Sequence, residues 1–193
     1  MPRALNPRHA SPSSTPAPRG SATTLKLLTA LALAAMVFAQ ALPRPTDASG
    51  ADVAAGYGSA TVGGAGGRLI NVSTADAFAA ALAASGPRIV QVAAGLYDVG
   101  KVRVKDPYLT VVGQPGAVIK GSILVVTDQV ILRGLSVLPG DQWDDPAALD
   151  AVTINGMSGS VSNVVLDHLT MLWGPDIGGL AILGDVSDVT VQH

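Results

Sequence analysis

Short runs of β-branched residues, bounded by Gly, Asp and Asn, dominate this chain after residue 87. The runs have a period of two, and no helix of useful length intervenes, which predicts β-strands. The predicted strands cover residues 89–92, 102–104, 109–112, 123–126, 130–132, 151–154, 164–166, 180–183 and 189–191. The chain is therefore expected to be an all-β protein.

Four of these strands follow a polar or aromatic residue in similar units that recur along the chain. The units begin at Tyr108, Gln129, Asn163 and Asp188, at intervals of 21, 34 and 25 residues. Repeats of that size are typical of solenoids, in which each coil contacts only its neighbours. An antiparallel sandwich is the alternative, but its hairpins favour two-residue turns, and Asn-Gly occurs only once, at Asn155-Gly156.

One short helix is predicted near the start of the strand region. Residues 69–72 form a strand, Ser73 and Thr74 supply an N-cap, and the helix covers about residues 75–84 before Gly86-Pro87 ends it. Phe78 and Leu82 lie one turn apart on an otherwise alanine-rich surface. We expect this helix to cap the open end of the strand stack.

A glycine-rich segment, residues 56–67, precedes that region and raises the question of a nucleotide-binding loop. The dinucleotide fingerprint requires a third glycine where Thr61 stands, and a P-loop requires Gly-Lys-Ser/Thr. Both are absent from the segment, so neither nucleotide motif is predicted.

The first 41 residues are predicted to be a disordered leader and a secretory signal peptide. Lys26 precedes a short apolar run, and Ala39-Gln40-Ala41 provides a cleavage site after Ala41. An uncleaved membrane anchor is the alternative. Residues 42–55 are expected to be a linker and residues 56–193 the folded domain, located outside the cytoplasm, in the periplasm or the extracellular space.

Charge and composition exclude several classes of protein. The formal net charge is −2 and no basic cluster is present, so a nucleic-acid partner is not expected. The chain has no cysteine, which excludes disulfides and thiolate metal sites. We expect a monomer without stable membrane insertion once the signal is removed.

Six segments carry a resemblance to a known family through their order along the chain. They are Gly56-Tyr57-Gly58 with the Gly-Gly pairs that follow, Ala83-Ala84-Ser85-Gly86-Pro87-Arg88, Ile131-Leu132-Arg133-Gly134-Leu135, Pro139-Gly140-Asp141, Asp150-Ala151-Val152-Thr153-Ile154 and Val164-Val165-Leu166-Asp167-His168. In this order they resemble the pectate lyases. The resemblance implies a right-handed parallel β-helix, C-terminally incomplete here, and calcium-dependent β-elimination on acidic polysaccharide such as polygalacturonate.

The resemblance also implies roles for individual residues. Asp150 and Asp176 match calcium ligands, and Arg133 matches a strand position for which we expect a substrate-binding or structural role. The family's proton-abstracting arginine is expected beyond His193. Ala181 stands where the family carries a further acid, which puts calcium binding in question.

Other interpretations of these residues stay open. Asp150 and Asp176 can be turn-capping aspartates, and Asp144 and Asp145 are expected to form a solvated loop. Asp167-His168 is expected to fix a coil rather than to perform chemistry.

The sequence predicts no metal centre built from histidines, because His9 lies in the leader and His193 is the last residue of the sequence. A non-catalytic β-helix that binds carbohydrate or serves as a structural module is the alternative function. Another uronate lyase on the same fold is a third.

Overall fold

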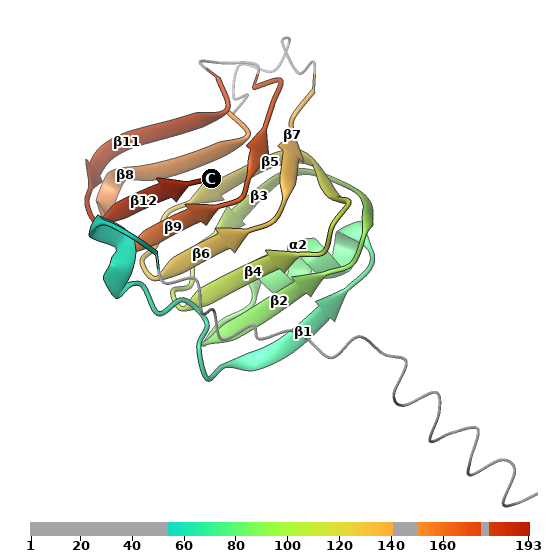
Figure 1. Ribbon diagram of the computed structural model, residues 1–193, viewed down its shortest axis with the longest axis horizontal. Coiled ribbons are helices and arrows are strands. Elements are labelled where there is room, and N and C mark those ends of the chain that lie inside the picture. The colour runs from blue at the N-terminus through green and yellow to red at the C-terminus, as the bar shows by residue number, and fades with distance from the viewer. Residues whose placement is uncertain (1–53, 141–149, 175–177) are drawn as a thin grey trace, which may run out of the picture. The chain divides into compact units, whose positions relative to one another are not determined.

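A computed structural model describes residues 54–140, 150–174 and 178–193. The predicted leader and signal peptide, most of the linker, and Asp144, Asp145 and Asp176 lie outside the described residues. No helix in the described ranges has the length and apolar character needed to cross a bilayer. The described residues are mostly β-strand, with one α-helix (Figure 1).

The first sheet contains six parallel strands in the order β1-β2-β4-β6-β9-β12 (Figure 1). Their bounds are β1 Arg68–Val72, β2 Arg88–Val92, β4 Leu109–Gly113, β6 Val130–Arg133, β9 Val164–Asp167 and β12 Val189–Gln192. The four repeat residues directly precede β4, β6, β9 and β12, and all have left-handed φ angles between 51° and 61°. The predicted repeat therefore marks the same turn in successive passages of the chain.

The second sheet has the order β10-β7-β5-β8-β11, with β3 also paired to β5. Its strands are β3 Gly95–Val104, β5 Ala117–Val125, β7 Ser136–Leu138, β8 Val152–Val161, β10 Thr170–Met171 and β11 Leu180–Val186. From β2 to β9 each strand of the first sheet is followed by one or two strands of the second sheet, and one such round through both sheets is called a coil below. Every strand pairing in the described residues is parallel, which rules out the antiparallel sandwich there.

The hydrophobic core lies where apolar rows of the two sheets face each other. Val111 and Leu132 of the first sheet and Ile123 and Ile154 of the second are fully buried. In a stack of parallel strands each row continues into the next coil, so that neighbouring coils bury one another. The side chain at the β11 end of the second-sheet row is exposed to solvent. Ile182 of β11, the register partner of Ile154, is 47% exposed, although Ile154 itself is 0% exposed.

The predicted helix is present as α2, Ala75–Ala83. Thr74 is its N-cap, and its Oγ1 accepts a hydrogen bond of 3.2 Å from the backbone N–H of Ala77. Phe78 and Leu82 are buried in the core. The centroids of the Phe78 ring and of the Tyr97 ring on β3 are 6.1 Å apart. The helix therefore covers an apolar end of the core, as the alanine-rich pattern with two large apolar residues predicts.

The glycine-rich segment runs along the first sheet from β12 to β1, whereas the strands that follow it along the chain succeed one another from β1 to β12. It includes the 3₁₀ turn η1, Tyr57–Ala60. The backbone N–H of Gly58 donates to Thr190 Oγ1 of β12 at 2.9 Å, and that of Gly64 donates to Thr110 Oγ1 of β4 at 2.9 Å. A Cβ at Gly64 would lie 1.8 Å from the carbonyl oxygen of Arg88. These glycines allow close packing on the sheet.

Candidate functional site

A groove lies over β3, β5 and β8 of the second sheet. It has a volume of about 370 Å³. Its lining residues are Arg103, Leu124, Val126, Asn155, Ser158, Gly159 and Ser160. Arg103 and Leu124 are neighbours in register on β3 and β5, and each alternates with buried residues on its strand. The groove therefore lies on the outer face of this sheet.

The groove combines one cation with uncharged hydrogen-bonding groups. Arg103 is exposed, and its guanidinium offers five N–H donors in a planar fork that matches a carboxylate. The hydroxyls of Ser158 and Ser160 are exposed on the same side, and Asn155 Oδ1 accepts a hydrogen bond of 2.9 Å from the N–H of Met157. Such a set is suited to a ligand that carries both carboxylate and hydroxyl groups.

Asp150, the predicted calcium ligand, lies two residues before the start of β8 of this sheet. Its side chain is buried, and its Oδ1 accepts a hydrogen bond of 2.7 Å from the backbone N–H of Gly178. Calcium binds six to eight oxygen atoms, and several of these are usually carboxylate oxygens. Asp150 is the only predicted calcium ligand in the described ranges, because Asp176 lies outside them. These residues alone do not provide a calcium site, and the geometry of Asp150 fits a turn-capping role.

Ala181, which stands where the resemblance implies an acid, lies on β11 opposite Thr153 of β8. Its side chain is largely buried, with 9% exposure. Neither Ala181 nor Thr153 has a carboxylate that could bind calcium. The calcium prediction therefore depends on residues outside the described ranges.

Arg133, the predicted substrate-binding residue, lies on the first sheet, whereas the groove lies on the second. It is the last residue of β6 and the register partner of Asp167, the last residue of β9. Its Nε donates a hydrogen bond to Asp167 Oδ2, and its side chain is 25% exposed. This contact gives Arg133 a structural partner, and its role in substrate binding stays a prediction.

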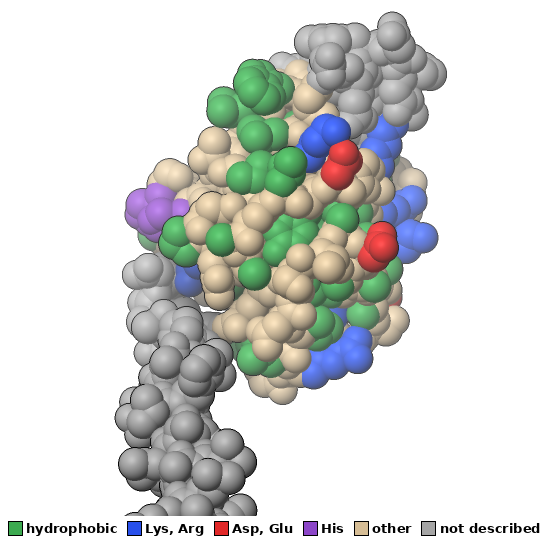
Figure 2. Space-filling model, turned by 90° about the vertical axis from the view of Figure 1, so that its right-hand side faces the viewer, with side chains coloured by type: hydrophobic (Ala, Val, Ile, Leu, Met, Phe, Trp, Pro, Cys, Tyr) green, Lys and Arg blue, Asp and Glu red, His purple; other side chains and the backbone are tan. Residues whose placement is uncertain are grey.

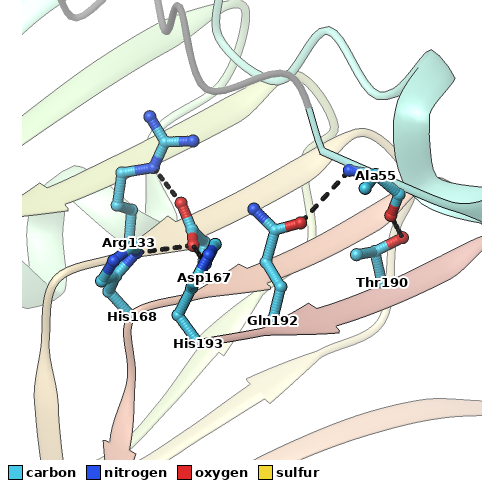
Figure 3. Close-up of polar contacts among 7 residues, drawn as sticks. All are labelled: Ala55, Arg133, Asp167, His168, Thr190, Gln192 and His193. Atoms are coloured by element: carbon cyan, nitrogen blue, oxygen red, sulfur yellow. Dashed lines mark hydrogen bonds and ion pairs between the residues drawn. The ribbon is translucent and has the colours of Figure 1, made fainter.

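A cluster of Asp167, His168 and His193 lies beside Arg133 (Figure 3). The Nδ1 atoms of His168 and His193 lie 2.7 and 3.1 Å from Asp167 Oδ1. The two imidazole rings are stacked with centroids 4.3 Å apart. The prediction that no histidine cluster forms was therefore wrong. The signal was the repeat itself, because the 25-residue step from Asn163 to Asp188 also carries His168 onto His193.

The environment of Asp167 keeps its carboxyl group ionised. Its side chain is fully buried, and burial raises its pKa. Hydrogen bonds from His193, His168 and Gln192, together with the charge of Arg133, outweigh burial and lower the pKa to about 2. At neutral pH the cluster therefore contains a buried carboxylate with a cationic neighbour.

Comparison with known proteins shows a likeness of fold. No family model matches the sequence, and no curated protein matches it. Among solved structures, a pectate lyase from Xanthomonas campestris with two substitutions superposes with a TM-score of 0.55 at 23% sequence identity. The match covers 70% of this chain and 49% of that one, so this chain spans about half the length of that lyase. The chain therefore has a pectate lyase-like fold.

Proposed function

We propose, from this shared fold, that the chain is the exported N-terminal part of a right-handed parallel β-helix that binds acidic polysaccharide such as polygalacturonate. The observation that carries the proposal is the groove over β3, β5 and β8, in which Arg103 lies beside Asn155 and exposed serines. The groove is on the outer face of a parallel sheet in a pectate lyase-like fold.

The chemistry of the groove favours a polyuronate over a neutral glycan. Each uronate ring carries one carboxylate, which a guanidinium can bind through two parallel N–H bonds. The amide of Asn155 and the hydroxyls of Ser158 and Ser160 complement sugar hydroxyls. Since the net charge of the chain is −2, attraction of a polyanion has to come from a local cation such as Arg103.

Cleavage by β-elimination would require parts beyond the described residues. We propose that calcium bound through Asp150 and Asp176 would neutralise a uronate carboxylate, and that an arginine beyond His193 would remove the proton. The open inward positions Ile182 and Val191, 47% and 52% exposed, offer a surface on which a further coil would stack. On this proposal residues 1–193 bind the polymer without cleaving it.

A non-catalytic binding or structural module is the second candidate. Two observations favour it: Ala181 contributes no carboxylate beside Thr153, and Asp150 Oδ1 already accepts the N–H of Gly178. A lyase releases an unsaturated uronide that absorbs ultraviolet light. A longer product of the gene that binds polygalacturonate in calcium yet releases no such uronide would establish the module.

Replacing Arg103 tests the groove directly. We expect Arg103→Ala to weaken the binding of oligogalacturonate by about tenfold, because one charge-assisted hydrogen-bonding group is lost. Isothermal titration at low ionic strength measures the affinity. Arg68→Ala is the matched control, since Arg68 is an exposed arginine on β1 of the first sheet, and it should bind as the parent does. Equal affinity of the Arg103→Ala variant and the parent would reject the groove.

Calcium dependence is tested on the same ligand. We expect calcium to strengthen oligogalacturonate binding by the parent, and Asp150→Asn to abolish that increase, because the substitution removes a carboxylate ligand. The control is Asp98→Asn, an exposed aspartate on β3 paired with Lys120. Titrations in calcium and in chelator give the comparison. Identical affinities in the two conditions would remove calcium from the proposal and leave the groove.

A further inference from the structure

We propose that Asp167, His168 and His193 form a binding site for a divalent transition-metal ion of the Zn²⁺ class. The three residues lie at the carboxyl ends of β9 and β12, where Asp167 pairs in register with Gln192. The site is on the first sheet, and the proposal does not depend on polysaccharide binding. One nitrogen from each histidine and one oxygen from the aspartate would be the protein ligands.

The ligand atoms already converge. The Nδ1 atoms of both histidines lie 2.7 and 3.1 Å from Asp167 Oδ1, and the three ligand atoms are all within 4.8 Å of one another. A tetrahedral zinc site has metal–ligand bonds of about 2.0–2.2 Å, which places neighbouring ligand atoms about 3.3 Å apart. An ion can therefore bind between these three atoms after small side-chain movements.

The aspartate is held in position by its surroundings. Its side chain has no exposed area, and its second oxygen, Oδ2, accepts the Nε–H of Arg133 (Figure 3). A carboxylate ligand fixed by an outer hydrogen bond is a common feature of protein metal sites. Arg133 thus orients Asp167 and leaves Oδ1 to face the two imidazoles.

The two histidines occupy one unusual backbone position in successive coils. His168 and His193 have left-handed φ angles of 50° and 66°. The preceding coil has Gly134 at the matching position, with φ of 68°. Histidine meets a steric cost there that glycine avoids. This backbone position stacks the two rings, with 19° between their planes, above the same carboxylate oxygen.

The surroundings favour a transition metal and leave room for outside ligands. The side chains of His168 and His193 are 55% and 57% exposed, and they form the histidine patch at the surface in Figure 2. Imidazole ligands suit zinc, copper and nickel, whereas calcium and magnesium prefer oxygen. Three protein ligands leave a fourth position of a tetrahedral ion for water.

The test uses the full chain, freed of metal by a chelator that is then removed by dialysis. We expect Zn²⁺ to bind with one-to-one stoichiometry in calorimetry, and Co²⁺ to give the visible absorption of a tetrahedral complex. His168→Gln and His193→Gln should each weaken Zn²⁺ binding at least tenfold. His9→Gln is the control, because it removes the third histidine of the chain outside the site.

A second measurement keeps the test independent of variant folding. In the parent, Zn²⁺ should shift the imidazole NMR signals of His168 and His193, and an excess of Ca²⁺ should not reverse the shift. Circular dichroism establishes whether each variant is folded. Failure of the parent to bind Zn²⁺ at micromolar concentrations overturns the proposal. So does unchanged affinity in folded His168→Gln and His193→Gln variants.

Discussion

Arg88→Ala is expected to lower the free energy of unfolding by about 3 to 5 kcal/mol, because each buried acceptor that is left without a donor costs about 1 to 3 kcal/mol. Arg88 begins β2 and its side chain is fully buried. Its Nε donates to the carbonyl of Ala81 at 3.0 Å, and its Nη2 donates to that of Leu82 at 2.9 Å. The last carbonyls of a helix lack partners within the helix. Arg88 therefore satisfies the C-terminal end of α2.

The charge of Arg88 is compensated in the same place. Burial lowers its pKa, whereas the negative charge of Asp106 raises it. The C-terminal end of a helix carries partial negative charge, which favours a cation there. Nη1 also donates to the carbonyl of Gly86 at 3.0 Å. Alanine would leave several buried carbonyls without a donor, and this is why the expected loss is large.

Chemical denaturation followed by circular dichroism measures this effect. Arg68→Ala is the matched control, because Arg68 is the register partner of Arg88 on β1 but is exposed. Its loss should change the free energy of unfolding by less than about 0.5 kcal/mol, as for most surface substitutions. An Arg88→Ala variant as stable as the control would show that the helix end is satisfied in another way.

The sequence predicted the strands of the first sheet and the step from coil to coil because both depend on local chemistry, whereas it missed β7 and β10 and the first halves of β3 and β5. Alternating β-branched residues identify inward and outward positions. The residues that precede the strands mark a turn with left-handed φ, as at Asn163 and Asp188. The capping helix was predicted from Thr74, which serves as its N-cap, and from Gly86-Pro87, which ends it. These features need no knowledge of long-range contacts.

Features that depend on pairing between distant segments were not predicted in full. The strand predicted at residues 151–154 overlaps β8, which begins at Val152 and extends to Val161 through small polar residues such as Gly156 and Ser158. That stretch is a strand because β11 pairs with it, and its Gly156 lies opposite Gly184. The groove over β8 depends on this extension, so no local pattern indicated it.

The candidate sites were also predicted only in part, because contacts between distant residues determine which side chains meet. The resemblance indicated Asp150 by its place in the sequence, but it could not show that the N–H of Gly178 already binds its Oδ1. His168 and His193 were treated as separate residues. Only the stacking of β9 and β12 brings their rings together. Coil spacing would have to be applied to every polar residue to find such pairs.

Asp167→Asn is expected to destabilise the protein by about 2 to 3 kcal/mol at neutral pH, measured in chelator. The carboxyl of Asp167 has a pKa of about 2 in the folded protein. An unperturbed aspartate has a pKa of about 3.9. Because the folded pKa is the lower one, the stabilisation is fully present above the unfolded pKa. It is lost as the pH falls through the folded pKa.

The pH dependence separates this charge effect from a simple loss of packing. The parent and Asp167→Asn should differ most above about pH 5 and converge toward about pH 2, because protonation removes in the parent the same charge that the variant lacks. Asp98→Asn is the control, since the Asp98–Lys120 pair is exposed and should contribute less than about 1 kcal/mol. A difference between parent and Asp167→Asn that stays constant with pH would mean that shape, and not charge, makes Asp167 important. Convergence would show that Arg133 and the two histidines stabilise the coils through one buried carboxylate.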